Sequence, residues 1–272
     1  MLEQKQTQNQ AKKYDPLRSL FASYCPYKYR NDIYKLICIN GEIATIREQV
    51  SEAPQGLTRL QFWLMQLESI NNGNPLQTPS AEWLAHLTST YNLSLGDLQK
   101  WILTRQKEYE PMPIQSPHNW WDYMQNTGGL TAKFWLQIIN NHATYEQIQQ
   151  VVNIGSIWAS VGCLRAIGFH SYIRLNLLPK ELLYQHGFML PDGWRASKDD
   201  DLSPIICELN LATQAKINQI QAKTLPKSLR LHLFMASELC NHLKACEHNP
   251  FHPLWTDIPK KSYWKLFLKS FT

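Results

Sequence analysis

The sequence has no long apolar segment and contains few of the residues that usually interrupt helices. No stretch of about 18 or more consecutive apolar residues occurs, so no membrane-spanning helix is expected. Glycine is scarce, at 11 of 272 residues, and long stretches contain no proline, while 44% of the residues are hydrophobic. This composition favours helices around a large hydrophobic core, and we therefore predict an all-α fold.

The chain also lacks paired cysteines, tracts of basic residues and a targeting sequence. Its six cysteines are scattered without a Cys-x-x-Cys pair, which fits buried thiols in a reducing compartment. The net charge of +5 is mild, and no Lys/Arg tract alternates with aromatic residues, so nucleic acid is not an expected partner. The first residues have neither the apolar segment of a signal peptide nor the arginines of a mitochondrial presequence. We expect residues 1–13 to form a polar, disordered arm.

Helical periodicity dominates the rest of the sequence. No strand-like alternation competes with it, and no internal repeat or long linker divides the chain. Residues 14–272 are therefore predicted to be one helical domain, a bundle with a central cavity in which helix 32–52 packs across helix 145–170. The other expected helices are a segment around 60–70 and the ranges 80–91, 94–109, 118–140, 202–222 and 227–243.

Two stretches carry the strongest indication of function. Residues 41–63 read GEIATIREQVSEAPQGLTRLQFW, and residues 155–179 read GSIWASVGCLRAIGFHSYIRLNLLP. Together they resemble the two central helices of the squalene/phytoene synthase family. REQVSE with LQFW, and CLRA-x-x-FH before LLP, resemble the branch that contains the mitochondrial assembly factor for respiratory complex I and its bacterial relatives. The resemblance starts near Tyr14, is also dense in WILTRQKEYE, and implies an isoprenoid-synthase-like helical bundle.

The acids that prenyl transfer requires are largely missing from both stretches. The departing diphosphate of an allylic substrate is held by Mg²⁺, a hard ion that prefers several carboxylate and water oxygens. The family's first cluster, Asp-Asp-x-x-Asp, falls on Ala44, Thr45 and Glu48, which leaves one acid. Its second cluster begins with Leu-Arg-Asp, and the matching residues after Arg165, from Ala166 to His170, include no acid. This departure argues against the family's reaction.

Five polar residues of these stretches are the candidate ligand-binding residues: Glu42, Glu48, Glu52, Arg165 and His170. Arg165 matches the family's diphosphate-facing arginine and suits phosphate oxygens, or else forms an internal salt bridge to Glu42 or Glu48. Glu48 and Glu52 are spaced i, i+4 and either bracket one weakly held cation or form a solvated helix end. His170 either carries a proton or is a core histidine at a helix end. Only Glu48 and Arg165 remain as remnants of a catalytic site.

No metal site is predicted elsewhere in the chain. Consecutive residues of the run 199–201 point in different directions, and Asp201 is suited to cap the helix that follows. A group of cysteines and histidines near the C-terminus fits no common zinc spacing and is interrupted by prolines. Its members are Cys240, His242, Cys246, His248 and His252.

The C-terminal segment KKSYWKLFLKSF, residues 260–271, has a basic face and an apolar face. Lys261, Lys265 and Lys269 lie on the basic face, so this helix either rests on an anionic membrane surface or docks its apolar face on the core.

Two functions are consistent with these patterns. The first is a non-catalytic protein, without a cofactor, whose cavity binds a prenyl or acyl lipid or a protein partner; the resemblance implies assembly of a respiratory complex. The second is a Mg²⁺-dependent prenyltransferase that joins two isoprenoid diphosphates head to head. The missing acids favour the first, because one buried carboxylate cannot hold a cluster of Mg²⁺ and diphosphate. The expected location is the bacterial cytoplasm, with peripheral contact to the inner membrane.

Overall fold

The computed structural model describes residues 2–74, 77–112, 114–191, 194–245, 250–251, 258 and 260–269. Throughout these ranges the regular structure is helical and no strand is found, so the predicted all-α fold is confirmed. In the first part of the chain the helices are α1 (Leu2–Tyr14), α2 (Pro16–Ala22), α3 (Tyr27–Ala44), the 3-10 helix η1 (Ile46–Gln49), α4 (Ala53–Asn71), α5 (Pro79–Tyr91), α6 (Leu95–Thr104) and the 3-10 helix η2 (Arg105–Tyr109).

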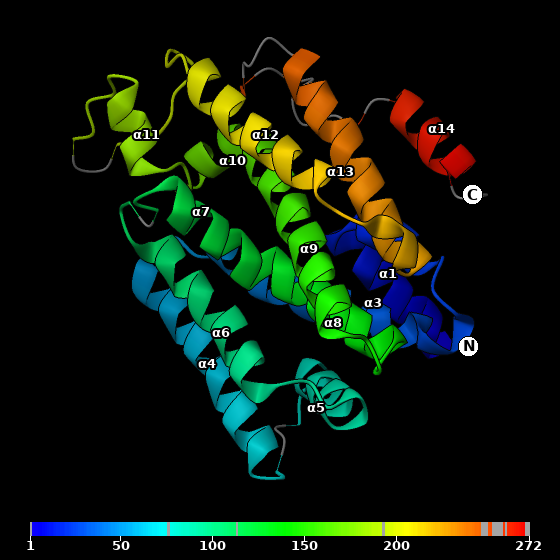
Figure 1. Ribbon diagram of the computed structural model, residues 1–272. Helices are drawn as coiled ribbons and strands as arrows, with labels where there is room; N and C mark the ends of the chain where they lie inside the picture. The colour runs from blue at the N-terminus through cyan, green and yellow to red at the C-terminus, as the bar shows by residue number, and fades with distance from the viewer. Residues whose placement is uncertain are drawn as a thin grey trace.

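The second part of the chain continues from α7 to α14 (Figure 1). None of the described helices combines the length and the apolar character needed to cross a lipid bilayer. The helices are α7 (Pro117–Met124), the π-helix η3 (Gln125–Gly129), α8 (Leu130–Ile139), α9 (Tyr145–Arg165), α10 (Ile167–Tyr172), α11 (Lys180–Gln185), α12 (Ser203–Asn218), the 3-10 helix η4 (Ala222–Thr224), α13 (Lys227–Ala245) and α14 (Lys260–Lys269).

Helix α9 lies in the middle of the bundle. It packs against η3 and α8 on one side and against α12 and α13 on another, while α4, α5 and α6 gather at one end of the molecule (Figure 1). Helix α3 packs on α1, α5 and α8. Helix α8 packs on both α3 and α9, and the two stretches meet directly where Arg47 donates to the carbonyl oxygen of Arg174, while the predicted crossing of helices 32–52 and 145–170 stays a prediction.

A close backbone approach joins η3 to α9. A Cβ atom added to Gly155 would lie 2.2 Å from the carbonyl oxygen of Gly128, and one added to Gly128 would lie 2.4 Å from that of Gly155. Both distances are far below van der Waals contact, so the two backbones can touch only because neither residue has a side chain. This crossing fixes the α7–η3–α8 unit against the central helix.

Side-chain caps explain where several of these helices begin. Thr144 and Gln147 form a reciprocal capping box at the start of α9. Thr78 and Ser116 each accept a hydrogen bond from a first-turn backbone N–H and precede a proline that opens the helix. These Ser/Thr-Pro pairs are readable in the sequence, which is why the starts of α5 and α7 were predicted closely.

The N-terminal arm predicted for residues 1–13 is instead a helix. Residues 2–14 form α1, which packs on α3 with Thr7 and Ala11 buried. Tyr14 packs directly on Gly41 of α3, where an added Cβ would lie 2.2 Å from the tyrosine Cγ. This contact is hard to predict from the polar sequence of α1, because among its described side chains the buried ones are the small residues Thr7 and Ala11.

Both long helices predicted around the motifs end earlier than expected. The first ends at Ala44, and the next residue, Thr45, donates both its backbone N–H and its hydroxyl to the carbonyl oxygen of Gly41, at 3.0 and 2.9 Å. The second ends at Arg165, and the short helix α10 continues in a new direction after Ala166. Each motif therefore spans a helix end and the loop after it.

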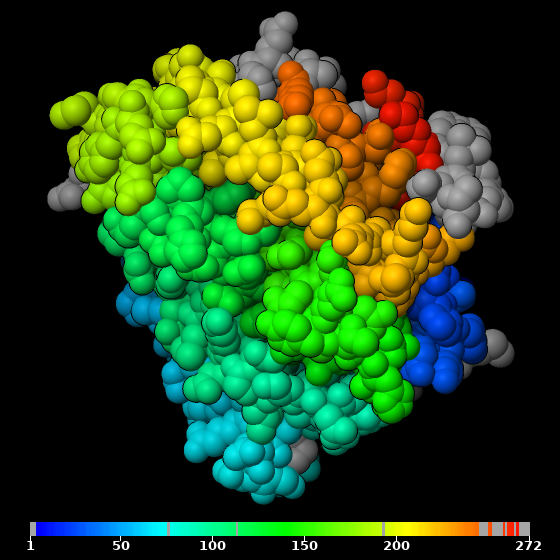
Figure 2. Space-filling view, in the orientation of Figure 1, coloured from blue at the N-terminus to red at the C-terminus, as the bar shows by residue number. Residues whose placement is uncertain are grey.

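Helix α14 docks on α13 (Figure 2). Leu266 and Ser262 are buried there, and Lys265 Nζ lies 2.8 Å from Glu238 Oε2. Lys261 remains exposed, whereas the side chains at 264, 267–269 and 271 lie outside the described residues. The docked arrangement matches the second of the two interpretations of this segment.

Candidate functional site

A pocket of about 1190 Å³ opens where the two motif stretches face each other. One wall is made by residues 47–52 and Gln55, which connect α3 to α4. The opposite wall is made by residues 171–174 at the end of α10 and by residues 195–198 before α12, with Phe251 beside them. The turns that end both motif helices thus create the pocket.

Cationic side chains outnumber acidic ones around this pocket. The lining includes the two acids that the sequence nominated, Glu48 and Glu52. The cationic residues of the lining come from both walls and had not been recognised in the sequence. They are Arg47, Arg174, Arg195 and Lys198, which we call the basic group.

Arg47 connects the two walls. Its Nη2 donates to the backbone carbonyl oxygen of Arg174 at 3.2 Å, and its guanidinium lies 5.6 Å from the centre of the Tyr109 ring. Tyr109 in turn packs on Gly56 at the start of α4, where an added Cβ would lie 2.1 Å from the tyrosine oxygen. The first wall is therefore held against both the second wall and η2.

Arg174 occupies a backbone position that usually belongs to glycine. Its φ is 56°, in the left-handed region. The N–H of Arg174 donates to the carbonyl oxygen of Ser171 at 3.1 Å, and the N–H of Leu175 donates to that of His170 at 2.8 Å. These two bonds form a Schellman motif that ends α10, and glycine is favoured at its left-handed residue because an L side chain there costs about 1–2 kcal/mol.

The loop that supplies Arg195 and Lys198 is shaped by the acidic run that follows it. Ser197 N–H donates to Asp200 Oδ2 at 2.7 Å, and Ser203 N–H donates to Asp201 Oδ1 at 3.1 Å. Asp200 and Asp201 thus bind backbone N–H groups, but the N-cap residue of α12 is Leu202, so the cap expected at Asp201 lies one residue too early.

Glu48 and Glu52 lie on one wall of the pocket but do not share a helical face. Glu48 belongs to η1, and Glu52 is the extended residue before α4, so the helical i, i+4 geometry expected for them is wrong. Both are exposed. Protein atoms near the Glu48 carboxyl nevertheless raise its pKa through desolvation, and the neighbouring charge of Glu108 adds to this shift, opposed by Arg105.

The other candidates lie elsewhere. Glu42 lines a separate pocket of about 430 Å³, where its Oε2 accepts a hydrogen bond from Ser80 Oγ at 2.5 Å, and burial raises its pKa. His170 borders a space of only about 10 Å³, and burial, assisted by the charge of Arg105, lowers its pKa to about 4. Arg165 is half-buried at the end of α9 and is not among the described residues that line the large pocket.

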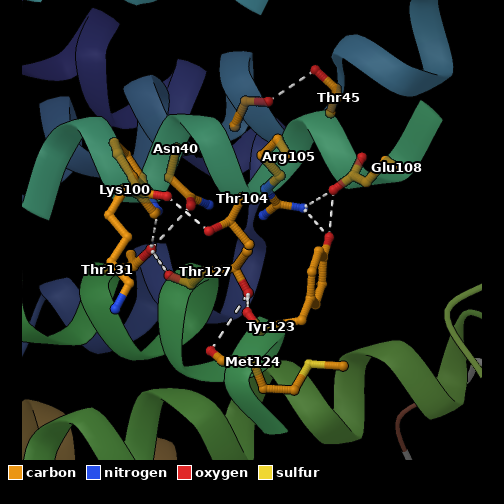
Figure 3. A network of polar contacts seen from close by, with 12 residues as sticks. Asn40, Thr45, Lys100, Thr104, Arg105, Glu108, Tyr123, Met124, Thr127 and Thr131 are labelled. Carbon is orange, nitrogen blue, oxygen red and sulfur yellow. Dashed lines mark hydrogen bonds and ion pairs between the residues drawn. The ribbon is translucent and has the colours of Figure 1, made fainter. Parts of the chain in front are cut away.

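A buried polar network fills the interior beside the pocket (Figure 3). Arg105 Nη1 lies 2.7 Å from Glu108 Oε1 and donates to Tyr123 Oη at 3.1 Å, while the Tyr123 hydroxyl donates to the same Glu108 oxygen. Burial lowers the pKa of Arg105, but the facing Tyr123 and Glu108 oxygens outweigh burial and raise it. The charge of this arginine shifts the pKa of both Glu48 and His170, so the network lies between the pocket and the core.

A second branch of the network reaches α3 (Figure 3). The Thr131 hydroxyl accepts a hydrogen bond from Trp101 Nε1 at 3.1 Å and lies 3.1 Å from Asn40 Oδ1. Both branches include residues of the WILTRQKEYE stretch, namely Trp101, Arg105 and Glu108. The resemblance of this stretch to the family did not reveal that its residues form a buried network.

The residues around the pocket do not fit Mg²⁺. The ion takes nearly octahedral oxygen ligands, whereas Glu48 and Glu52 are outnumbered here by cationic side chains. Thr45, at a matched acid position, already donates its hydroxyl proton to the carbonyl oxygen of Gly41. Among the residues that the structure describes, no three His, Cys, Asp or Glu side chains are grouped closely enough to share a metal ion.

Comparison with known proteins assigns the chain to a family. The sequence profile of squalene/phytoene synthases matches residues 11–267, nearly the whole chain. The chain belongs to the squalene/phytoene synthase family. Solved structures agree in fold: squalene synthase HpnC from Alicyclobacillus acidocaldarius superposes with a TM-score of 0.75 at 15% identity, covering 92% of this chain and 95% of that one. A dehydrosqualene synthase in complex with ligand gives a TM-score of 0.80 at 12% identity, covering 98% and 95%.

The curated relatives of this chain are named for the assembly of complex I rather than for a synthase reaction. The human protein named NADH dehydrogenase (ubiquinone) complex I, assembly factor 6, is 26% identical over 238 residues, which cover 84% of this chain and 70% of the relative. The protein of the same name from Bos taurus is also 26% identical over 238 residues, with the same coverage. The branch that the motifs resembled is thus confirmed.

Proposed function

We propose that this chain is a non-catalytic member of its family that binds a lipid or protein partner during assembly of respiratory complex I. The observation that carries the proposal is the excess of cationic over acidic side chains around the pocket. Where the family's chemistry needs several carboxylates to hold Mg²⁺, the basic group outnumbers Glu48 and Glu52.

This excess of positive charge opposes the family's reaction. Loss of an allylic diphosphate requires divalent cations that coordinate the departing oxygens, and those cations must be held by carboxylates. The pocket can bind an anion without providing the groups that would break its bond to carbon.

The curated relatives support the second half of the proposal. They are named as assembly factors of complex I, and they align with most of this chain. Such a role needs a stable binding surface rather than a cofactor. In this proposal the protein works in the bacterial cytoplasm beside the inner membrane, with a prenyl or acyl lipid or a subunit of the complex as its partner.

The first experiment tests for condensing activity. Purified protein is incubated with farnesyl or geranylgeranyl diphosphate and Mg²⁺, and pyrophosphate release is measured. We expect no release above background. Turnover that Glu48→Gln abolishes would instead support the alternative, a prenyltransferase that condenses two isoprenoid diphosphates head to head.

The second experiment tests the role in assembly. Cells of the parent organism that lack this chain should contain less assembled complex I, measured by native gels and by NADH oxidation in isolated membranes. Both the native chain and the Glu48→Gln/Glu52→Gln variant should restore it, because the proposed role uses neither carboxylate as a metal ligand. Normal complex I in the deleted cells would contradict the proposal.

A further inference from the structure

We infer that the pocket binds a phosphate-bearing anion directly through the basic group, without a metal ion. This inference rests on the proposed function, since it names the class of ligand for the same pocket. A planar guanidinium presents several N–H donors that match phosphate oxygens, and such charge-assisted hydrogen bonds are the strong ones. Arg47, Arg174 and Arg195 supply three guanidinium groups, and Lys198 adds a point charge.

The basic group forms no ion pair with a carboxylate in the part of the chain that the structure describes. Arg47 Nε is buried and has no hydrogen-bond partner in the described part of the chain. A buried N–H that is left unpaired costs free energy, so the Arg47 side chain is held in the pocket wall at some cost.

The backbone at Arg174 gives an independent reason to expect a ligand. Glycine would fill this left-handed position at the end of α10 with less strain. Within the described residues, the hydrogen bonds of Arg174 use its backbone: its N–H donates to Ser171 and its carbonyl oxygen accepts from Arg47. The left-handed backbone thus carries an arginine side chain at a cost that glycine would avoid, and this side chain lines the pocket.

Aromatic side chains at the rim are compatible with a ligand at a membrane surface. Tyr172 lines the pocket and keeps 83% of its surface exposed, and Phe169 on the same short helix is 43% exposed. Aromatic rings beside basic residues suit the headgroup region of a bilayer. The phosphate can thus belong to a lipid headgroup or to a soluble compound, and the two sources can be distinguished by experiment.

Binding is measured first with inorganic pyrophosphate in the presence of EDTA, by titration calorimetry. The native protein should bind without Mg²⁺, and Arg174→Gly should weaken binding at least tenfold. The same variant should keep or raise the melting temperature, because it relieves the left-handed residue and leaves the carbonyl oxygen that Arg47 contacts. Lys107→Ala, an exposed lysine outside the pocket, is the control for the loss of one positive charge.

A second variant removes the two members of the basic group that lie in the loop before α12, Arg195 and Lys198. Arg195→Ala/Lys198→Ala should also weaken pyrophosphate binding at least tenfold. Its control is Lys12→Ala/Lys13→Ala on α1, which removes the same charge from exposed positions away from the pocket. Equal weakening by the control would show that net charge, and not the pocket, attracts the anion.

The source of the phosphate is determined by vesicle sedimentation. If a lipid headgroup is the ligand, the native protein sediments with phosphatidylglycerol vesicles but not with phosphatidylcholine vesicles, and Arg174→Gly remains in solution. If a soluble phosphate is the ligand, pyrophosphate binds while neither kind of vesicle does. Either pattern supports the inference.

Four results would overturn it: no binding of pyrophosphate or vesicles, binding that requires Mg²⁺, unchanged binding by both pocket variants, or equal weakening by the control variants. These results would leave the role in complex I assembly standing, because that role is tested in cells. Release of pyrophosphate from a prenyl diphosphate, by contrast, would refute the proposed function.

Discussion

The buried network of Arg105, Glu108 and Tyr123 should behave as one electrostatic unit, so that removing one charged member destabilises the protein more than removing all three. Glu108 keeps 4% of its side chain exposed and Arg105 keeps 17%, so solvent screens their interaction weakly. Glu108→Gln leaves the buried guanidinium without a counter-charge, and breaking such a pair costs ~3–5 kcal/mol. Because the amide oxygen can still accept one hydrogen bond from Arg105, we expect the lower end, ~3 kcal/mol, which corresponds to a fall of roughly 6–12 °C in melting temperature.

The comparison that tests this reasoning is a variant that removes every polar member. Arg105→Met/Glu108→Leu/Tyr123→Phe replaces the three side chains with apolar groups of similar volume, and it should cost less than the single change, ~1 kcal/mol or below. Free energies of unfolding are measured by urea denaturation, with the dependence on urea checked for a constant slope. A single variant near the stability of the native protein, with a triple variant that unfolds readily, would refute the electrostatic explanation.

Two further predictions concern the core. Gly155→Ala should destabilise the protein by ~2 kcal/mol or more in urea denaturation, because its Cβ would meet the backbone of Gly128. The control is Gly162→Ala on the same helix, whose Cβ meets nothing and which should stabilise the protein by up to ~1 kcal/mol. Equal effects of the two variants would contradict the close crossing. Burial lowers the pKa of His170 to about 4 and that of His232 to about 3 from 6.5, so stability is full above about pH 6.5 and falls as the pH drops toward these values. By pH 4 the loss is ~3 kcal/mol at most per histidine, and His232→Leu should flatten the decline; an unchanged slope between pH 7 and pH 4 would contradict it.

The helical architecture could be predicted because it depends on local patterns. Apolar periodicity and Ser/Thr-Pro starts are encoded within each helix, and the two motif stretches identified the family. The end of α3 could not be placed, because Ile46 and Val50 continue the helical spacing of apolar residues beyond Ala44 and no proline or glycine marks the end there. Helix α1 was missed for a different reason, since its burial is supplied by other helices, α3 and α2, which its own polar sequence does not reveal.

The candidate site was predicted in part. Glu48 and Glu52 line the pocket, as residues of one quoted stretch, and Ser171 to Arg174 belong to the other. Arg195 and Lys198 lie in a loop with no motif of its own, far from Arg47 in sequence, and only the packing of the bundle brings them there. Reading the motifs as depleted of acids was correct, but it did not reveal that Arg47 and Arg174 of the same stretches line the pocket together with Arg195 and Lys198 from another segment.

Arg174 has a practical consequence for anyone who engineers this protein. Laboratory selection for heat resistance, or automated redesign that scores only the folded backbone, will favour glycine at a left-handed residue such as this one. The resulting protein would melt later, express well and pass every test of folding, yet lack one of the guanidinium groups of its pocket. Selection for a hardier variant must therefore include a measurement of anion binding at every round, or recognition will be lost unnoticed.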